Sequence, residues 1–108
     1  MNNKLLSLLG MAKKAGRILC GYEKALESIH KHRAFVVFTA SDLSEKTERG
    51  LIYACEEMDT KVIRLGVSMF ELSNAVGQKT GIVSVNDKGF AKRLIELNKE
   101  IEASEKAE

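Results

Sequence analysis

The order of apolar and polar positions predicts a regular alternation of helices and strands. Apolar residues recur at helical spacing from Asn3 to Ala15, and Gly16 then favours a stop. Short β-branched or aromatic runs, typical of strands, occur at 17–20, 35–39, 61–65 and 82–85. Helical spacing returns between and after these runs, at 22–31, 44–58, 68–76 and about 88–101. This alternation indicates the α/β class and a three-layer α/β/α sandwich, with about four strands in a mixed sheet and helices on both faces.

Local sequence also predicts where some elements lie or begin. The run 35–39 has almost no polar break, which favours a central strand covered on both faces. The run 41–45 offers several N-cap candidates for the helix at 44–58, Asp42 with Glu45 three residues later being one. Ser68 and Glu71 form a capping-box pattern before a short helix that Gly77 closes. Asn86 or Asp87 is expected to cap the last helix.

The length of 108 residues fits one compact domain, and we place it at 1–103 with a frayed charged tail at 104–108. The chain has 44% apolar and 30% charged residues, without proline or tryptophan, as in ordinary globular proteins. No apolar run approaches the roughly 18 residues of a membrane span, and the N-terminus lacks the pattern of a signal peptide. We therefore expect a cytoplasmic monomer with no membrane partner.

Positive charge is concentrated in the first third of the chain. Residues 1–33 hold seven basic and two acidic side chains, a net charge of +5, whereas 34–64 carry −2 and 65–108 carry −1. Such a segment can contact phosphates with an affinity that falls as salt rises. The alternative is a solvated helix face, which many soluble domains have.

Few residues suggest catalysis or metal binding. The sequence has no glycine-rich nucleotide motif and no nucleophile motif. His30 and His32 stand two apart in a predicted helix, where they face different directions and cannot share a metal. Cys20 and Cys55 have no cysteine or histidine at metal-ligand spacing and are expected to be buried thiols. We therefore expect a non-catalytic protein with no catalytic residue, no metal and no cofactor.

The junction between the first predicted strand and the second helix is the strongest candidate site. A glycine at such a turn lets a ligand approach the backbone, and the free N–H groups of the helix's first turn face outward. Lys24 and Lys31 on that helix, with Arg17 before it, add positive charge, and Tyr22 can stack or form a hydrogen bond. The alternative is a turn glycine that begins an ordinary amphipathic helix.

Four spaced blocks stand out in the sequence: GRILCGYEKA at 16–25, AFVVFTASD at 34–42, ELSNAVG at 71–77 and VNDKGFAKRL at 85–94. Together they resemble the L7Ae superfamily of ribosomal and kink-turn RNA-binding proteins. The last block looks most like the bacterial YlxQ-type branch, and the resemblance covers about residues 4–97. It implies an α/β/α sandwich that binds a kink-turn, which is an RNA helix bent sharply at a short bulge flanked by G·A pairs.

The resemblance also implies which residues contact RNA. In that family the start of the second helix enters the RNA groove, and the loop before the last strand packs against bulged nucleotides. Carried over to this chain, the first group is Gly21, Tyr22, Glu23, Lys24, Glu27 and Lys31, with Arg17 just before it. The second group is Lys79, Thr80, Gly81 and Ile82. The implied partner is ribosomal RNA or another structured RNA with a kink-turn, with the ribosome as a further partner.

The chain departs from the best-known binders, which have Gly-Thr-Asn-Glu followed by Lys one turn later. Here Glu23 replaces the Asn and Glu27 replaces the Lys, which brings negative charge toward phosphate. Lys31 at i+4 can offset the charge of Glu27 on the helix itself. A rival interpretation is a protein-interaction module on the same fold with weak or no RNA binding. A second rival is a fragment of an RNA methyltransferase, but a chain of 108 residues leaves no room for that enzyme's cofactor-binding domain.

Overall fold

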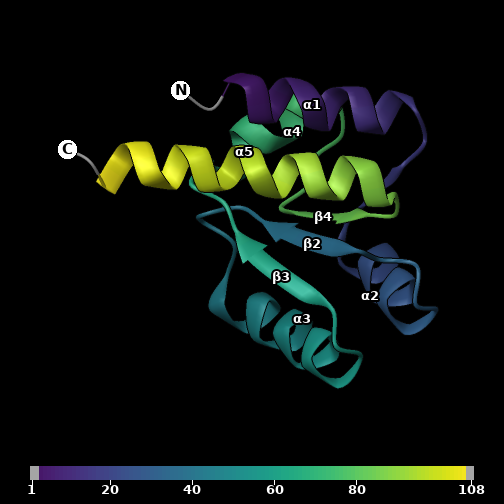
Figure 1. The fold of residues 1–108 in the computed structure, drawn as a ribbon. Coiled ribbons are helices and arrows are strands. Elements are labelled where there is room, and N and C mark those ends of the chain that lie inside the picture. The colour runs from purple at the N-terminus through teal and green to yellow at the C-terminus, as the bar shows by residue number, and fades with distance from the viewer. Residues whose placement is uncertain (1–2, 107–108) are drawn as a thin grey trace.

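Helices and strands alternate along the whole of the computed structural model, which describes residues 3–106 (Figure 1). The helices are α1 (Asn3–Lys14), α2 (Tyr22–His30), α3 (Glu45–Glu57), α4 (Met69–Val76) and α5 (Lys88–Lys106). The strands are β1 (Ile18–Cys20), β2 (Val36–Thr39), β3 (Lys61–Arg64) and β4 (Ile82–Val85). Each predicted helix and strand is therefore present, with ends within a few residues of the predicted ones.

The four strands form one mixed sheet in the order β1-β4-β2-β3. Strand β4 runs antiparallel to both β1 and β2, while β2 and β3 are parallel. All four residues of β2 are buried, which confirms a central strand covered on both faces. Strand β3 lies at one edge of the sheet and is partly exposed. The register pairs Cys20 with Val83, so the end of β1 lies beside the start of β4.

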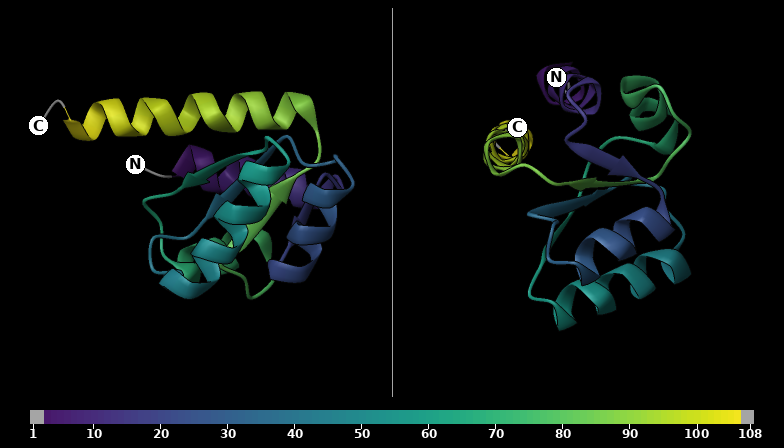
Figure 2. Two further views of the ribbon diagram at one scale, coloured as in Figure 1. Left: turned by 90° about the horizontal axis from the view of Figure 1, so that it is seen from below. Right: turned by 90° about the vertical axis from the view of Figure 1, so that its right-hand side faces the viewer.

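The helices cover both faces of the sheet, which confirms the three-layer α/β/α sandwich. Helices α1, α4 and α5 lie on one face, and α2 and α3 lie on the other (Figure 2). Neighbouring residues of β2 point alternately into these two layers, as strand geometry requires. Phe38 belongs to the core under α1, α4 and α5, whereas Val37 belongs to the core under α2 and α3.

The sequence predicts the cap of α4 correctly and that of α3 in part, since Ser44 lies in the run 41–45 that holds its several candidates. Ser68 Oγ accepts a hydrogen bond from the Glu71 N–H at 3.1 Å, and the Glu71 carboxylate accepts one from the Ser68 N–H at 3.0 Å. This confirms the capping box of α4, and Gly77 ends that helix in the left-handed conformation, with φ 71°. The capping-box candidate at Asp42 is wrong, because Ser44 caps α3 and the Asp42 carboxylate accepts the Met69 N–H at 2.8 Å.

The last helix begins as predicted and is longer than predicted. Asp87, one of the two expected caps, accepts a hydrogen bond from the Phe90 N–H at 2.8 Å. The helix continues to Lys106, so residues 104–106, placed in a frayed tail from sequence, are helical here. Alanine, glutamate and lysine in this stretch favour a helix once it has begun. Positions 107 and 108 of that tail lie outside the described residues, and none of the described helices has the length and hydropathy needed to cross a membrane.

Candidate RNA interface

The turn between β1 and α2 depends on the backbone of Gly21. This residue has φ 103° and ψ 158°, a conformation almost restricted to glycine, and it is the N-cap of α2 without a side-chain cap. Its N–H donates to the Ile82 carbonyl at 3.0 Å, and its own carbonyl accepts the Ala25 N–H. The N–H groups of Tyr22, Glu23 and Lys24 have no hydrogen-bond partner within residues 3–106. They form the positive end of the helix dipole.

The loop before β4 is fixed by its own hydrogen bonds. Thr80 Oγ1 donates to the Ile82 carbonyl at 2.7 Å and accepts the Ile82 N–H at 3.1 Å. The Thr80 N–H donates to Ser73 Oγ at 2.9 Å, which ties the loop to α4. Thr80, Gly81 and Ile82 are buried, and Lys79 alone among the four predicted loop residues has an exposed side chain. Three of the four therefore hold the loop in place, and Lys79 is the one whose side chain faces outward.

The structure brings the two predicted segments together although they are far apart in the sequence. The hydrogen bond from Gly21 to Ile82 continues the β1–β4 ladder, so the start of α2 and the end of the 79–82 loop lie side by side. The open N–H groups of α2 and the loop carrying Lys79 therefore belong to one surface. We call this surface, which comprises Gly21, Tyr22, Glu23, Lys24 and Lys79, the junction surface.

Besides Lys24, which belongs to the junction surface, Lys13 of α1 lies next to it. Burial, the larger effect, raises the pKa of the Cys20 thiol, while the nearby charges of Lys13 and Lys24 act to lower it. Both lysines are thus near enough for their charges to act on the thiol of Cys20, the residue before Gly21. Lys13 Nζ also donates to Gln78 Oε1 at 3.1 Å, next to Lys79. The sequence analysis did not select Lys13 as a site residue. The one sequence feature that pointed to it was the concentration of positive charge in the first third of the chain.

Arg17 and Lys31 do not join the junction surface. Arg17 stands at the other end of β1, about 13 Å from Gly21 for an extended strand, where its carbonyl accepts the Asn86 N–H at 2.8 Å. Helix α2 runs back toward that same end, because Ser28 Oγ donates to Asn86 Oδ1 at 2.7 Å. Lys31, at the C-terminal cap of α2, consequently lies at the Asn86 end of the sheet. Arg17 thus lies outside the group that its place in the sequence suggested.

The remaining side chains of α2 have distinct surroundings. A Cβ at Gly50 of α3 would lie 2.6 Å from the Tyr22 hydroxyl, so the Tyr22 ring rests over α3 and is only 37% exposed. Glu27 forms an ion pair with Lys31 at 3.1 Å, which confirms the predicted i to i+4 contact. Glu23 is exposed and makes no ion pair within the described part of the chain. Of the two acidic departures, Glu27 is thus offset locally and Glu23 is not.

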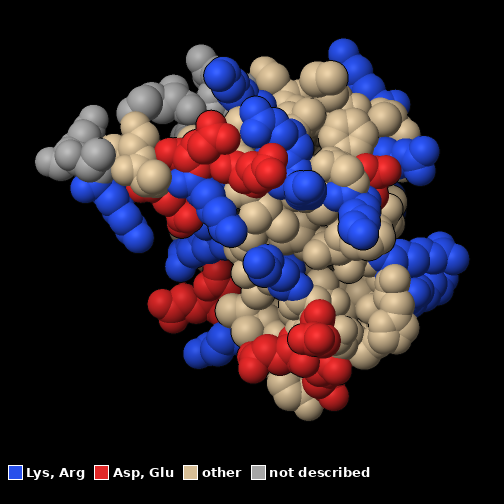
Figure 3. Space-filling view, in the orientation of Figure 1, with Lys and Arg blue, Asp and Glu red and all other residues tan. Residues whose placement is uncertain are grey.

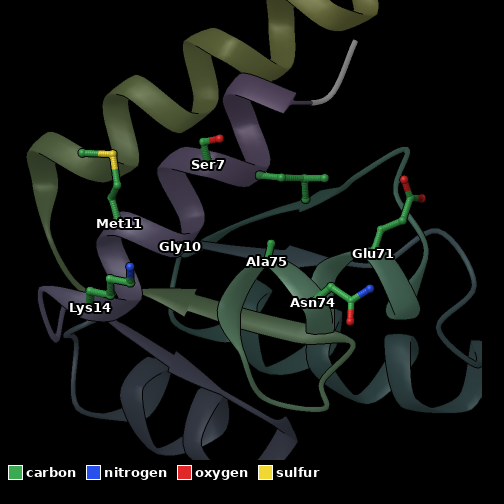
Figure 4. A pocket seen from close by; sticks show the side chains of 8 residues that line it. Ser7, Gly10, Met11, Lys14, Glu71, Asn74 and Ala75 are labelled. Carbon is green, nitrogen blue, oxygen red and sulfur yellow. The ribbon is translucent and has the colours of Figure 1, made fainter.

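A separate groove lies between α1 and α4, on the opposite face of the sheet from α2 (Figure 4). Its volume is about 540 Å³, and its walls include Ser7, Gly10, Met11 and Lys14 from α1 and Glu71, Asn74 and Ala75 from α4. The close approach of these helices requires Gly10, where a Cβ would meet the Ala75 carbonyl oxygen at 2.9 Å. Nowhere in residues 3–106 do three His, Cys, Asp or Glu side chains gather as metal ligands.

Comparison with known proteins gives a consistent relationship. The Ribosomal protein L7Ae/L30e/S12e/Gadd45 family matches residues 3–95. The chain is 30% identical over 94 residues to the RNA-binding protein YlxQ of Enterococcus faecium, covering 87% of this chain and 90% of that protein. It is 29% identical over 91 residues to the RNA-binding protein YlxQ of Bacillus subtilis (strain 168), covering 83% and 90% of the two chains. Both names describe RNA-binding proteins.

Solved structures show the same architecture. A Bacillus halodurans protein of unknown function superposes with a TM-score of 0.83 at 29% identity, covering 89% of this chain and 97% of that one. The Giardia lamblia 15.5kD RNA binding protein superposes with a TM-score of 0.72 at 22% identity, covering 94% and 88%. The second likeness supports the fold alone. Together with the sequence matches, these findings show that the chain belongs to the L7Ae/L30e/S12e/Gadd45 family, in its bacterial YlxQ-type branch of RNA-binding proteins.

Proposed function

We propose that the protein binds a kink-turn or a closely related bent RNA element through the junction surface, without catalysing a reaction. The observation that carries this proposal is the hydrogen bond from Gly21 to Ile82, which joins the start of α2 to the loop before β4. The two segments that the family resemblance assigns to RNA contact are therefore one continuous surface. A bent RNA can contact both at once, whereas an extended one meets them less well.

The chemistry of the surface suits RNA. Three free N–H groups at the start of α2 can donate to phosphate oxygens or base-edge acceptors, aided by the helix dipole. The side chains of Lys13, Lys24 and Lys79 surround them with positive charge. Because the turn is fixed by the Gly21 N–H and the loop by the side chains of Thr80 and Ser73, little ordering entropy is lost on binding. Tighter binding to the bent RNA shifts the population of the RNA toward that form.

The acidic residues of α2 modify this surface without removing it. The Glu27 carboxylate lies within 3.1 Å of Lys31 Nζ, so much of its charge is offset before RNA approaches. Glu23 remains exposed in the first turn, where it lowers the local positive potential. We therefore propose weaker phosphate attraction than in family members with Asn and Lys at these two positions. Recognition then depends more on the backbone donors than on net charge.

We also propose a cytoplasmic monomer whose target is ribosomal RNA or another structured RNA. The family takes its name from ribosomal proteins, and the chain carries one sandwich with one junction surface. Sedimentation of cell extract tests the ribosomal target directly. Co-migration with ribosomal particles at low salt and release at high salt would support it. Migration only at the position of the free protein would place the target elsewhere.

Charge reversal at Lys24 tests the junction surface. Lys24→Glu removes a positive charge beside the α2 N-terminus and adds a negative one. One phosphate contact is lost and one phosphate is repelled, so we expect the affinity for kink-turn RNA to fall about tenfold or more. Lys99→Glu, on exposed α5 across the sheet, is the matched control and should change affinity little. Both variants should unfold at the same denaturant concentration as the unmodified protein, within error. Equal effects of the two substitutions would show that the junction surface is not the RNA site.

A further inference from the structure

We propose that a second surface, at the opposite end of the sheet, binds a single-stranded RNA segment next to the structured element. We call it the Phe35 corner, and it comprises Arg17, Lys31, His32, Arg33, Phe35 and Lys88. The proposal rests on the RNA-binding function proposed above, but it concerns different residues and a different part of the RNA. Its features are an exposed aromatic ring and surrounding positive charge, on a rigid backbone.

Phe35 is an aromatic ring that the fold leaves uncovered. It is 51% exposed, whereas Val36, Val37 and Phe38 after it are completely buried. Its N–H donates to the Val85 carbonyl at 2.9 Å, so its backbone is held at the end of the sheet. The residue therefore stands where the sheet ends, with its ring half exposed to solvent. Such a ring offers a flat apolar face on which an unpaired base can stack.

The corner is assembled around the last residues of β4. The Arg17 carbonyl accepts the Asn86 N–H at 2.8 Å on one side of β4, and Phe35 bonds Val85 on the other. Two strand spacings separate Arg17 from Phe35, which is about 10 Å. The Arg33 N–H donates to the Ser28 carbonyl at 2.9 Å, and Ser28 Oγ donates to Asn86 Oδ1 at 2.7 Å. The loop after α2 is thereby tied to the same strand end.

Among the described residues, the corner holds two paired and two unpaired cations. Of its four Lys and Arg side chains, Lys31 pairs with Glu27 and Arg17 with Asp87, whereas Arg33 and Lys88 are left. Glu27 pairs with Lys31 at 3.1 Å and Asp87 lies 4.0 Å from Arg17.

Arg33 and Lys88 are exposed and make no ion pair within residues 3–106, so they are available to a ligand. Figure 3 shows Lys and Arg side chains at the right-hand edge, between the β4–α5 turn and α2, while Asp and Glu side chains lie over α3 and α5.

The combination selects single-stranded nucleic acid over a duplex. Bases in a duplex are stacked on one another and do not present a free face, whereas an unpaired strand can place a base on Phe35. The guanidinium of Arg33 and the amine of Lys88 can then contact the flanking phosphates. An acidic peptide would use the cations but would gain little from the ring. We therefore assign the corner to single-stranded RNA flanking a structured element.

A fluorescence anisotropy titration with a labelled oligouridine of about eight nucleotides tests the corner, a length within the usual range for one such surface. We expect Phe35→Ala to weaken binding about tenfold and Phe35→Trp to retain it, because stacking needs only an aromatic ring. Phe70→Ala is the matched control, since Phe70 is 75% exposed on α4 and lies outside the corner. Arg33→Ala leaves the aromatic core run unchanged. It is expected to weaken binding as well, without making the affinity for oligouridine more dependent on salt.

A second titration separates this proposal from the proposed function. We expect a kink-turn RNA with a single-stranded extension to bind more tightly than the same RNA with blunt ends, and Phe35→Ala to remove that difference. Lys24→Glu should weaken the binding of both kink-turn RNAs and leave the binding of oligouridine unchanged. Oligouridine binding that depends on Phe35 would uphold the corner even if kink-turn discrimination failed. No effect of Phe35→Ala and Arg33→Ala on either RNA, or tighter binding of a glutamate-rich peptide than of oligouridine, would overturn it.

Discussion

At the scale of single residues, the junction surface depends on the missing side chain of Gly21. Its φ of 103° and ψ of 158° fall in a region that residues with a Cβ rarely adopt. A Cβ there would meet no atom within 4 Å, so the constraint is on the backbone and not on packing. The conformation directs the Gly21 N–H to Ile82 and starts α2 with three open N–H groups. The residue therefore couples the fold to the proposed site.

Replacing Gly21 tests this coupling. Gly21→Ala should lower the free energy of unfolding by about 1–3 kcal/mol, the usual cost of a strained backbone, and should weaken kink-turn RNA binding as the α2 N-terminus shifts. Gly66→Ala is the control, because Gly66 has open space around it and no positive φ. Urea unfolding and RNA titration of both variants provide the comparison. If Gly21→Ala matched Gly66→Ala in both measurements, the junction would not depend on glycine geometry.

The buried thiols make a second prediction at this scale. Burial raises the pKa of the Cys55 thiol from its ordinary 9.0 to about 11. Between these values the unfolded chain loses the thiol proton and the folded chain keeps it, so the free energy of unfolding should fall as pH rises from 9 to 11. Cys55→Ala removes this contribution, and its urea midpoint should change less between pH 8 and pH 10 than that of the unmodified protein. An identical pH dependence would contradict the burial argument.

At the scale of elements, the sequence pattern predicted the features that depend on neighbouring residues. It failed for the features that depend on contacts between residues far apart in the sequence. The apolar spacing gave each helix and strand, and the Ser68–Glu71 capping box is local to one turn. The Asp42 candidate was wrong because that carboxylate is taken by the N–H of Met69 at the start of another helix. The burial of Thr80 depends on Ser73 of α4, which no short window of sequence contains.

The candidate site shows the same division between local and distant information. The resemblance identified the start of α2 and the loop before β4, and the β1–β4 register explains why they lie together. Arg17 was grouped with them because it is near in sequence, but β1 is extended and carries it to the other end of the sheet. Lys13 was missed because its neighbour Gln78 follows a helix more than sixty residues later. Pairing between distant strands and helices decides both cases.

The cap of α4 provides a prediction at the element scale. Ser68→Ala removes the hydroxyl that accepts the Glu71 N–H, and we expect the free energy of unfolding to fall by about 1 kcal/mol. The Ser73–Thr80 contact lies on the same short helix, so the loop before β4 should also exchange its amide hydrogens faster. Ser7→Ala, on the exposed face of α1, is the control and should change stability by less than about 0.5 kcal/mol. Equal stability of the two variants would argue against the cap.

At the scale of the whole molecule, the sandwich separates two surfaces with different characters. The junction surface combines backbone donors with lysines from α1, α2 and the 79–82 loop. The Phe35 corner, at the opposite strand ends, combines an aromatic ring with arginine and lysine side chains. Membership of the L7Ae/L30e/S12e/Gadd45 family agrees with the proposed binding of RNA. The net charge of +2 is small partly because α3, with four acidic and two basic side chains, offsets these surfaces.

The most direct test of the account is a calorimetric titration of two RNAs at moderate salt. One contains a generic kink-turn, and the other is identical except that Watson–Crick pairs replace its G·A pairs. We predict tight one-to-one binding of the first RNA and at least tenfold weaker binding of the second, because only the first adopts the sharp bend. Equal affinity for both RNAs would contradict kink-turn recognition and would leave a basic surface without shape selection.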